Sequence, residues 1–161
     1  MNQNFMKEKP ILPLVLSMAL PMTISMLVNS LYNIVDSYFV AQISENAMTA
    51  LSLVYPIQNI VTAVTVGFGI GINALVAFYL GAGQGHLANR ATSLGMLCNI
   101  VHGILLTIFC IGIMPMYLNI FTDNIDIVSQ GILYSQIVFS FSLPVSISIS
   151  FEKIFQAVGR M

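Results

Sequence analysis

The chain has 161 residues, of which 57% are hydrophobic and only 7% are charged, and its formal net charge is −1. A soluble domain carries about 25% charged residues, so this composition excludes an ordinary soluble protein and indicates a membrane protein. The sequence contains no basic run and no zinc-ligand spacing. It therefore gives no signal for nucleic-acid binding, and no metal site is predicted.

The few charged residues divide the chain into four long uncharged stretches. Each is longer than the roughly 20 residues that a helix needs to cross a bilayer. We therefore expect an all-α, polytopic membrane protein that interacts with the lipid bilayer through four transmembrane helices, at about 12–40, 48–80, 91–118 and 127–152.

The basic residues predict how these helices are oriented. Lys7 and Lys9 precede the first span, Arg90 lies between the second and third, and Lys153 and Arg160 follow the fourth. Basic residues are enriched on the cytoplasmic side of membrane proteins. We expect a multi-pass protein of the inner (cytoplasmic) membrane, with its N-terminus in the cytoplasm.

The first predicted span contains a carboxylate, Asp36, near its end. Inserting an Asp at the centre of a transmembrane helix costs roughly 2.5–3.5 kcal/mol, and such residues usually face a polar cavity or an ion pathway. Alternatively, the span ends near Val40 and the Asp36 side chain reaches the outer surface. At about 100° per residue, Asp36 shares one narrow stripe with other polar residues, and these are Ser25, Asn29, Tyr32 and Asn33.

Each predicted span also contains proline, which removes a backbone hydrogen bond and can kink a helix. Pro21 and Pro144 lie deep in the first and fourth spans and are the better candidates for bends. Pro56 and Pro115 are equally compatible with helix ends.

Other polar residues at membrane depth are candidates for lining a cavity or for hydrogen bonding between helices, and the second role is the commoner one. His102 has no evident partner, and a structural role is favoured for it. The polar candidates are Gln58, Asn59, Asn73, Asn99 and Gln136.

Small residues in the second and third spans predict close helix packing. Ala63, Gly67 and Gly71 recur every four residues in the second span, and Gly95 and Gly103 lie in the third. At the end of the fourth span, the adjacent Glu152 and Lys153 form either a solvated boundary pair or, less commonly, a gate.

Several segments, taken together and in order, resemble multidrug and toxic compound extrusion (MATE) transporters. The segment Leu31-Tyr32-Asn33-Ile-Val-Asp36-Ser-Tyr-Phe-Val40, with Pro21 before it, resembles the first helix of that family. Three later segments resemble the start of its second helix, the loop after that helix and the end of its fourth helix, and these are Ala50–Pro56, Leu75–Gly83 and Phe151–Gly159.

The resemblance implies a cation-coupled exporter of drug-like amphipathic or cationic compounds, driven by H⁺ or Na⁺ and requiring no other cofactor. MATE transporters have about twelve helices in two six-helix lobes. The resemblance implies that residues 1–161 are part of the N-terminal lobe and that the remaining helices are partners. Asp36 would be the cation-coupling carboxylate, with Tyr32 and Asn33 beside it, and Pro21 the point where the helix bends.

Three other interpretations stay open at this point. One is a small four-helix transporter that acts as a dimer, and another is a related flippase for lipid-linked oligosaccharides. The absence of Lys or Arg within the spans disfavours the flippase, since phosphate recognition needs positive charge. A membrane scaffold without transport is the third. An enzyme is not expected, because the sequence shows neither a nucleophile with a base nor a metal-binding motif.

Overall fold

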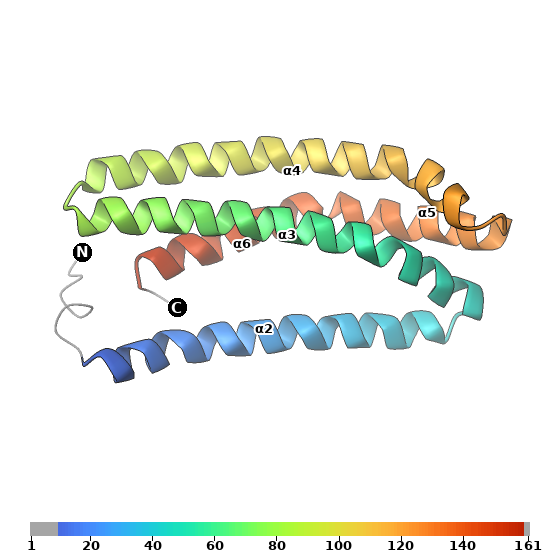
Figure 1. Cartoon of the computed structure of the whole chain (residues 1–161), viewed down its shortest axis with the longest axis horizontal. Helices are drawn as coiled ribbons and strands as arrows, with labels where there is room; N and C mark the ends of the chain where they lie inside the picture. The colour runs from blue at the N-terminus through green and yellow to red at the C-terminus, as the bar shows by residue number, and fades with distance from the viewer. Residues whose placement is uncertain (1–9, 160–161) are drawn as a thin grey trace.

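Five helices make up the computed structural model, which describes residues 10–159 (Figure 1). They are α2 (Ile11–Ala41), α3 (Glu45–Gly81), α4 (Gly85–Phe121), α5 (Ile125–Ser140) and α6 (Ser142–Ala157), and no strand occurs within the described range. Four segments are long and apolar enough to cross a membrane, with α5 and α6 together forming the fourth. The predicted all-α fold with four transmembrane spans is confirmed.

The helix ends follow from local sequence signals. The Ser44 side chain caps α3 by accepting a hydrogen bond from the Ala47 N–H at 3.0 Å, and Asn124 caps α5 by accepting from the Asp126 N–H. Such caps satisfy backbone donors that have no partner within the helix. After α3, Gly83 has a φ of 74°, a left-handed conformation that favours glycine and turns the chain into α4. These turns define two ends of the bundle, the 41–45 end and the 81–85 end.

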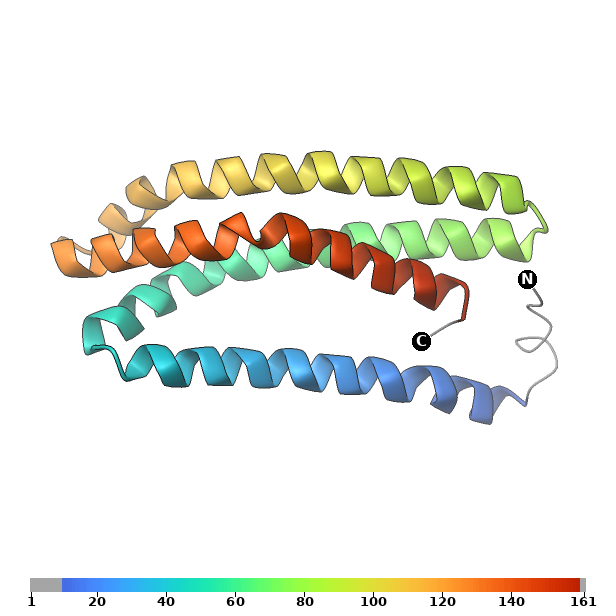
Figure 2. The same ribbon diagram turned by 180° about the vertical axis from the view of Figure 1, so that it is seen from behind.

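The fourth span is not one continuous helix, because it breaks at Phe141. The break lies three residues before Pro144, whose missing N–H leaves the Ser140 carbonyl without its usual helical donor. Side chains of Thr107 and Ser142 donate hydrogen bonds to the Phe139 carbonyl beside the break. The two helices consequently cross the bundle as one interrupted rod (Figure 2).

Three further prolines, each in the interior of a helix, have a different outcome. Pro21, Pro56 and Pro115 all lie inside helices that continue through them, namely α2, α3 and α4. Pro56 and Pro115 therefore do not mark helix ends. Only at Pro144 does proline coincide with a break among the described helices.

Helices α3, α4, α5 and α6 pack on one another around an apolar core. This core consists of buried side chains from α3, α4 and α5, which are Val54, Val61, Cys110, Met114, Leu118 and Phe139. Helix α2 lies along one side of this group, contacts α3 and has no buried residue (Figures 1 and 2).

In α3, the predicted glycines Gly67 and Gly71 do not make close contacts with another helix. An added Cβ at Gly67 or Gly71 would meet nothing within 4 Å, so that prediction was wrong. Gly69, about 200° round the helix from Gly67, instead faces α6. A Cβ there would lie 2.9 Å from the Lys153 Cγ, and one at Gly95 in α4 would lie 2.7 Å from Ile72. The expectation for Gly95 is confirmed.

Buried polar side chains join α4 to α6. The Asn99 amide donates to the Ser146 carbonyl at 3.0 Å and to the Ser150 hydroxyl at 2.6 Å, and the Ser146 hydroxyl donates back to Asn99 Oδ1 at 2.9 Å. The amide nitrogen and the side-chain oxygen of Asn99 therefore both have hydrogen-bond partners. Asn99 joins two helices, which is a structural role.

Candidate functional site

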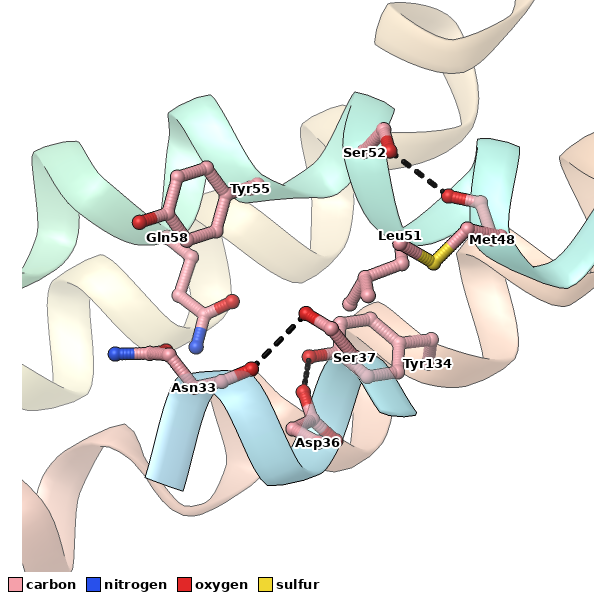
Figure 3. A pocket seen from close by; sticks show the side chains of 9 residues that line it. All are labelled: Asn33, Asp36, Ser37, Met48, Leu51, Ser52, Tyr55, Gln58 and Tyr134. Carbon is pink, nitrogen blue, oxygen red and sulfur yellow. Dashed lines mark hydrogen bonds between the residues drawn. The ribbon is translucent and has the colours of Figure 1, made fainter. Parts of the chain in front are cut away.

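The Asp36 carboxylate is joined to the fourth span by a direct hydrogen bond. The Tyr134 hydroxyl of α5 donates to Asp36 Oδ2 at 2.7 Å, across 98 positions of sequence (Figure 3). Both side chains are half-buried. Asp36 therefore faces the other helices, and the alternative in which it extends alone to the outer surface does not describe this structure.

A cavity of about 230 Å³ surrounds this hydrogen bond. Its wall combines polar residues of α2 and α3 with the phenol of α5, and Figure 3 shows these side chains grouped around Asp36. The Ser37 hydroxyl donates to the Asn33 carbonyl at 2.9 Å within α2. The lining residues are Asn33, Asp36, Ser37, Met48, Leu51, Ser52, Tyr55, Gln58 and Tyr134.

A second cavity of about 620 Å³ lies next to the first and shares Asn33, Tyr55 and Gln58 with it. Ligand sites for small molecules commonly measure about 300–1,000 Å³. The larger cavity is bounded by α2, α3, α5 and α6. Within the described range, no lysine or arginine lines either cavity. The lining residues are Met26, Asn29, Ser30, Tyr32, Asn33, Tyr55, Gln58, Asn59, Thr62, Ile137, Val138, Phe141, Val145 and Ile149.

The structure brings most of the predicted polar residues together. Asn29, Tyr32, Asn33, Gln58 and Asn59 all line the larger cavity. The stripe on the first span and the two amides of the second span therefore face each other across one space.

Three predicted residues make no hydrogen bond with Asp36. Tyr32 lines the larger cavity and is 65% exposed, but the hydrogen bond to Asp36 comes from Tyr134. Gln136 lines neither cavity; its side chain is exposed, about 200° round the helix from Tyr134. Pro21 lies 15 residues before Asp36, or about 22 Å along the helix axis.

Tyr134 is the residue that sequence reasoning missed. Nothing in its local sequence distinguishes it, because its partner lies on a helix 98 positions away. The one available signal is chemical, since a tyrosine in an apolar span usually needs a hydrogen-bond partner for its hydroxyl.

The chemistry available to the site is that of a single carboxylate with neutral oxygen and amide neighbours. Residues 10–159 contain no group of three or more His, Cys, Asp or Glu side chains arranged to hold a metal ion. A carboxylate in this setting can accept a proton, and oxygen ligands of this kind also suit a hard cation.

Comparisons with known proteins bear on the family and the fold of this chain. A curated protein named FAD transporter, from Shewanella oneidensis, is 27% identical over 83 residues, which are 52% of this chain and 18% of that protein. A solved structure of a MOP superfamily transporter from Pyrococcus furiosus superposes with a TM-score of 0.84 at 20% identity. It covers 91% of this chain and 32% of the solved one.

For the Pyrococcus furiosus transporter, the reverse polarity of its binding pocket suggests a different function. The chain thus spans about a third of that transporter, and its match covers less than a fifth of the curated relative. The MatE family model matches residues 21–161, which confirms the resemblance found in the sequence motifs. The chain belongs to the MatE family.

Proposed function

We propose that the protein containing this chain is a cation-coupled antiporter, with Asp36 as the coupling carboxylate. In this proposal it exports amphipathic or cationic compounds across the cytoplasmic membrane by alternating access. The observation that carries the proposal is the Tyr134–Asp36 hydrogen bond beside two connected cavities. The basic residues near the N-terminus and the 81–85 end support placing both on the cytoplasmic side.

Coupling would act through the contacts that hold α2. This helix has no buried residue, so the bond between Asp36 and Tyr134 is a large part of what ties it to α5. Hydrogen bonds to an ionised group are roughly twice as strong as neutral ones. Protonation of Asp36, or its use as a Na⁺ ligand, would therefore weaken or rearrange that bond and shift the population of α2 positions.

The driving force is sufficient for such a shift. One charge crossing a potential of 100 mV supplies about 2.3 kcal/mol, before any concentration gradient is added. This is about the size of a charge-assisted hydrogen bond, at roughly 1.5–3 kcal/mol.

Asp36→Asn in the full-length protein tests the coupling role. We expect this variant to lose gradient-driven export in proteoliposomes, because an amide neither takes up a proton nor carries the charge that binds Na⁺. Separate H⁺ and Na⁺ gradients identify the coupling ion. Glu45→Gln is the control, since Glu45 is an exposed residue of the first turn of α3. Normal export by Asp36→Asn at equal expression would contradict the proposal.

Export of a flavin nucleotide is a second candidate function. It is favoured by the similarity to the protein named FAD transporter. The lining of the two cavities disfavours it, because no basic residue there would meet a pyrophosphate. Uptake of FAD and of a cationic dye into inverted vesicles, measured side by side, separates the two candidates.

A further inference from the structure

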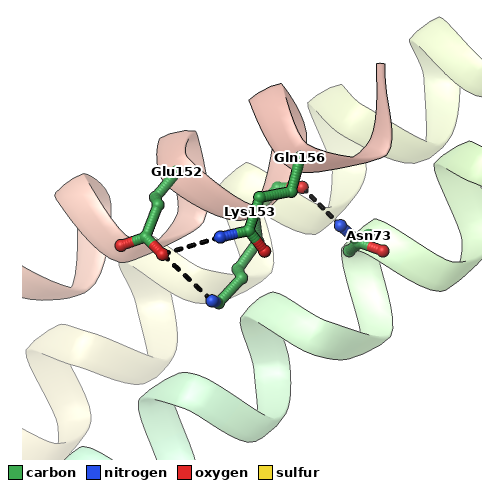
Figure 4. Close-up of polar contacts among 4 residues, drawn as sticks. All are labelled: Asn73, Glu152, Lys153 and Gln156. Carbon is green, nitrogen blue, oxygen red and sulfur yellow. Dashed lines mark hydrogen bonds and ion pairs between the residues drawn. The ribbon is translucent and has the colours of Figure 1, made fainter. Parts of the chain in front are cut away.

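Glu152 and Lys153 form an ion pair near the 81–85 end of the bundle, and it is the one salt bridge within residues 10–159. The Lys153 Nζ donates to Glu152 Oε1 at 3.0 Å, and the Gln156 side-chain amide donates to the same oxygen at 2.8 Å (Figure 4). One carboxylate oxygen thus has two donors from α6, and its orientation is set by them.

The pair is not an ordinary solvated boundary pair. The Lys153 side chain is only 11% exposed, whereas that of Glu152 is 45% exposed. Adjacent residues on a helix point about 100° apart and do not normally face each other. The lysine therefore lies buried with its ammonium turned back to the carboxylate, and the carboxylate is the member of the pair that stays accessible.

Contacts with α3 hold this arrangement in place. The Asn73 side-chain amide donates to the Lys153 carbonyl at 2.7 Å (Figure 4). The aliphatic part of Lys153 packs so closely on Gly69 that a Cβ there would lie 2.9 Å from its Cγ. The backbone and the lysine are both fixed, so the carboxylate is held by a rigid support and not by a free side chain.

Glu152 lies one helical turn beyond the last α6 residue that lines the 620 Å³ cavity and is not itself a lining residue. Phe141, Val145 and Ile149 line the 620 Å³ cavity, and Glu152 follows Ile149 by three residues on the same face. Glu152 lies 18 residues after Tyr134, or about 27 Å along the helices. It is therefore well separated from Asp36 and is not part of that site.

We propose that Glu152 is a binding group for a positive charge one helical turn beyond the large cavity, toward the 81–85 end of the bundle, and that Lys153 and Gln156 position it. The ligand class is an organic cation with an apolar body, since Val145 and Ile149, which line the cavity on the same face of α6, are apolar. This inference rests on the proposed function, in which that end is cytoplasmic and is where the exported compound enters.

The positive charge of Lys153 does not prevent Glu152 from binding a cation. The Lys153 side chain is less exposed than that of Glu152, and one Glu152 oxygen has no donor among the described residues. A cation can therefore contact that oxygen without displacing Lys153 or Gln156.

Equilibrium binding to the purified full-length protein tests this site with two probes of matched shape, tetraphenylphosphonium and tetraphenylborate. We expect Glu152→Gln to weaken tetraphenylphosphonium binding about fivefold, as for a partly exposed charge pair, and not to weaken tetraphenylborate binding. We expect Lys153→Met to have the opposite effect on tetraphenylphosphonium, because it leaves the carboxylate without its neutralising partner. Glu45→Gln is the matched control and should change neither affinity.

An unchanged tetraphenylphosphonium affinity in a folded Glu152→Gln protein would overturn the inference, and so would an equal loss for both probes. If that variant does not fold, an unchanged affinity in Lys153→Met would also overturn it. Competition by Na⁺ that is present in the unmodified protein and lost in Glu152→Gln would assign the site to inorganic cations as well. Loss of coupled export in Asp36→Asn with no effect at Glu152 would leave the proposed function standing and remove this inference alone.

Discussion

At the level of single residues, the Tyr134 hydroxyl has the clearest assignable role. It donates to the carboxylate of Asp36 at 2.7 Å, and both side chains are half-buried. Removing a partner from a buried or half-buried charged group costs more than the bond itself contributes, because the charge is left without a donor. The phenol therefore holds the Asp36 side chain in place and, through it, the position of α2.

Tyr134→Phe separates these effects from packing, since it removes only the hydroxyl. We expect slower export and a free energy of unfolding lower by about 1.5–3 kcal/mol in the full-length protein. Transport rates in proteoliposomes and thermal unfolding in detergent measure the two effects. Tyr32→Phe is the control, because the exposed Tyr32 makes no hydrogen bond to Asp36. Equal behaviour of the two variants would contradict the role of Tyr134.

Asn99 provides a second prediction at this scale. Its amide bonds Ser146 and Ser150 at full burial, so Asn99→Ala leaves those groups with fewer partners. We expect a loss of about 1–3 kcal/mol in the free energy of unfolding. Asn119→Ala is the comparison, because the exposed Asn119 only donates to the Pro115 carbonyl of its own helix. Thermal unfolding of both variants checks this, and a similar small loss in each would show that the network contributes little.

At the level of helices, the contrast between α2 and the other four organises the structure. Helices α3, α4 and α5 share an apolar core, and buried polar contacts join α6 to α4, whereas α2 has no buried residue. Among the described helices, α2 is the one held to the others without a buried side chain. The proline break between α5 and α6 is held by Thr107 and Ser142.

Close packing between α3 and α4 predicts opposite outcomes for two glycines. Gly95→Ala places a Cβ 2.7 Å from Ile72, and we expect a loss of about 1–3 kcal/mol from overpacking. Gly67→Ala meets nothing within 4 Å and should be neutral or stabilising by roughly 0.5–1 kcal/mol, since alanine favours helix. The unfolding temperatures of both variants test this. A larger loss at Gly67 than at Gly95 would contradict the observed packing.

At the scale of the whole molecule, the sequence predicts what depends on composition and on single-helix periodicity. The four spans follow from hydropathy, and the cavity-facing stripe with Asn29, Asn33 and Asp36 follows from spacing at 100° per residue. Features that depend on how one helix faces another were missed or misassigned. Tyr134 lacked any local signal, and Gly69 makes the close contact predicted for Gly67, because spacing alone does not tell which face meets a neighbour.

The 98 positions between Asp36 and Tyr134 also have a consequence for how the protein is made. Ribosomes add about 5–20 residues per second, so Asp36 is synthesised roughly 5–20 s before its hydrogen-bond donor exists. During that interval α2 has entered the membrane with a carboxylate that no tyrosine yet satisfies. The bond that joins α2 to α5 can therefore form only after the fourth span has been made, so it belongs to the last stage in the assembly of these four spans.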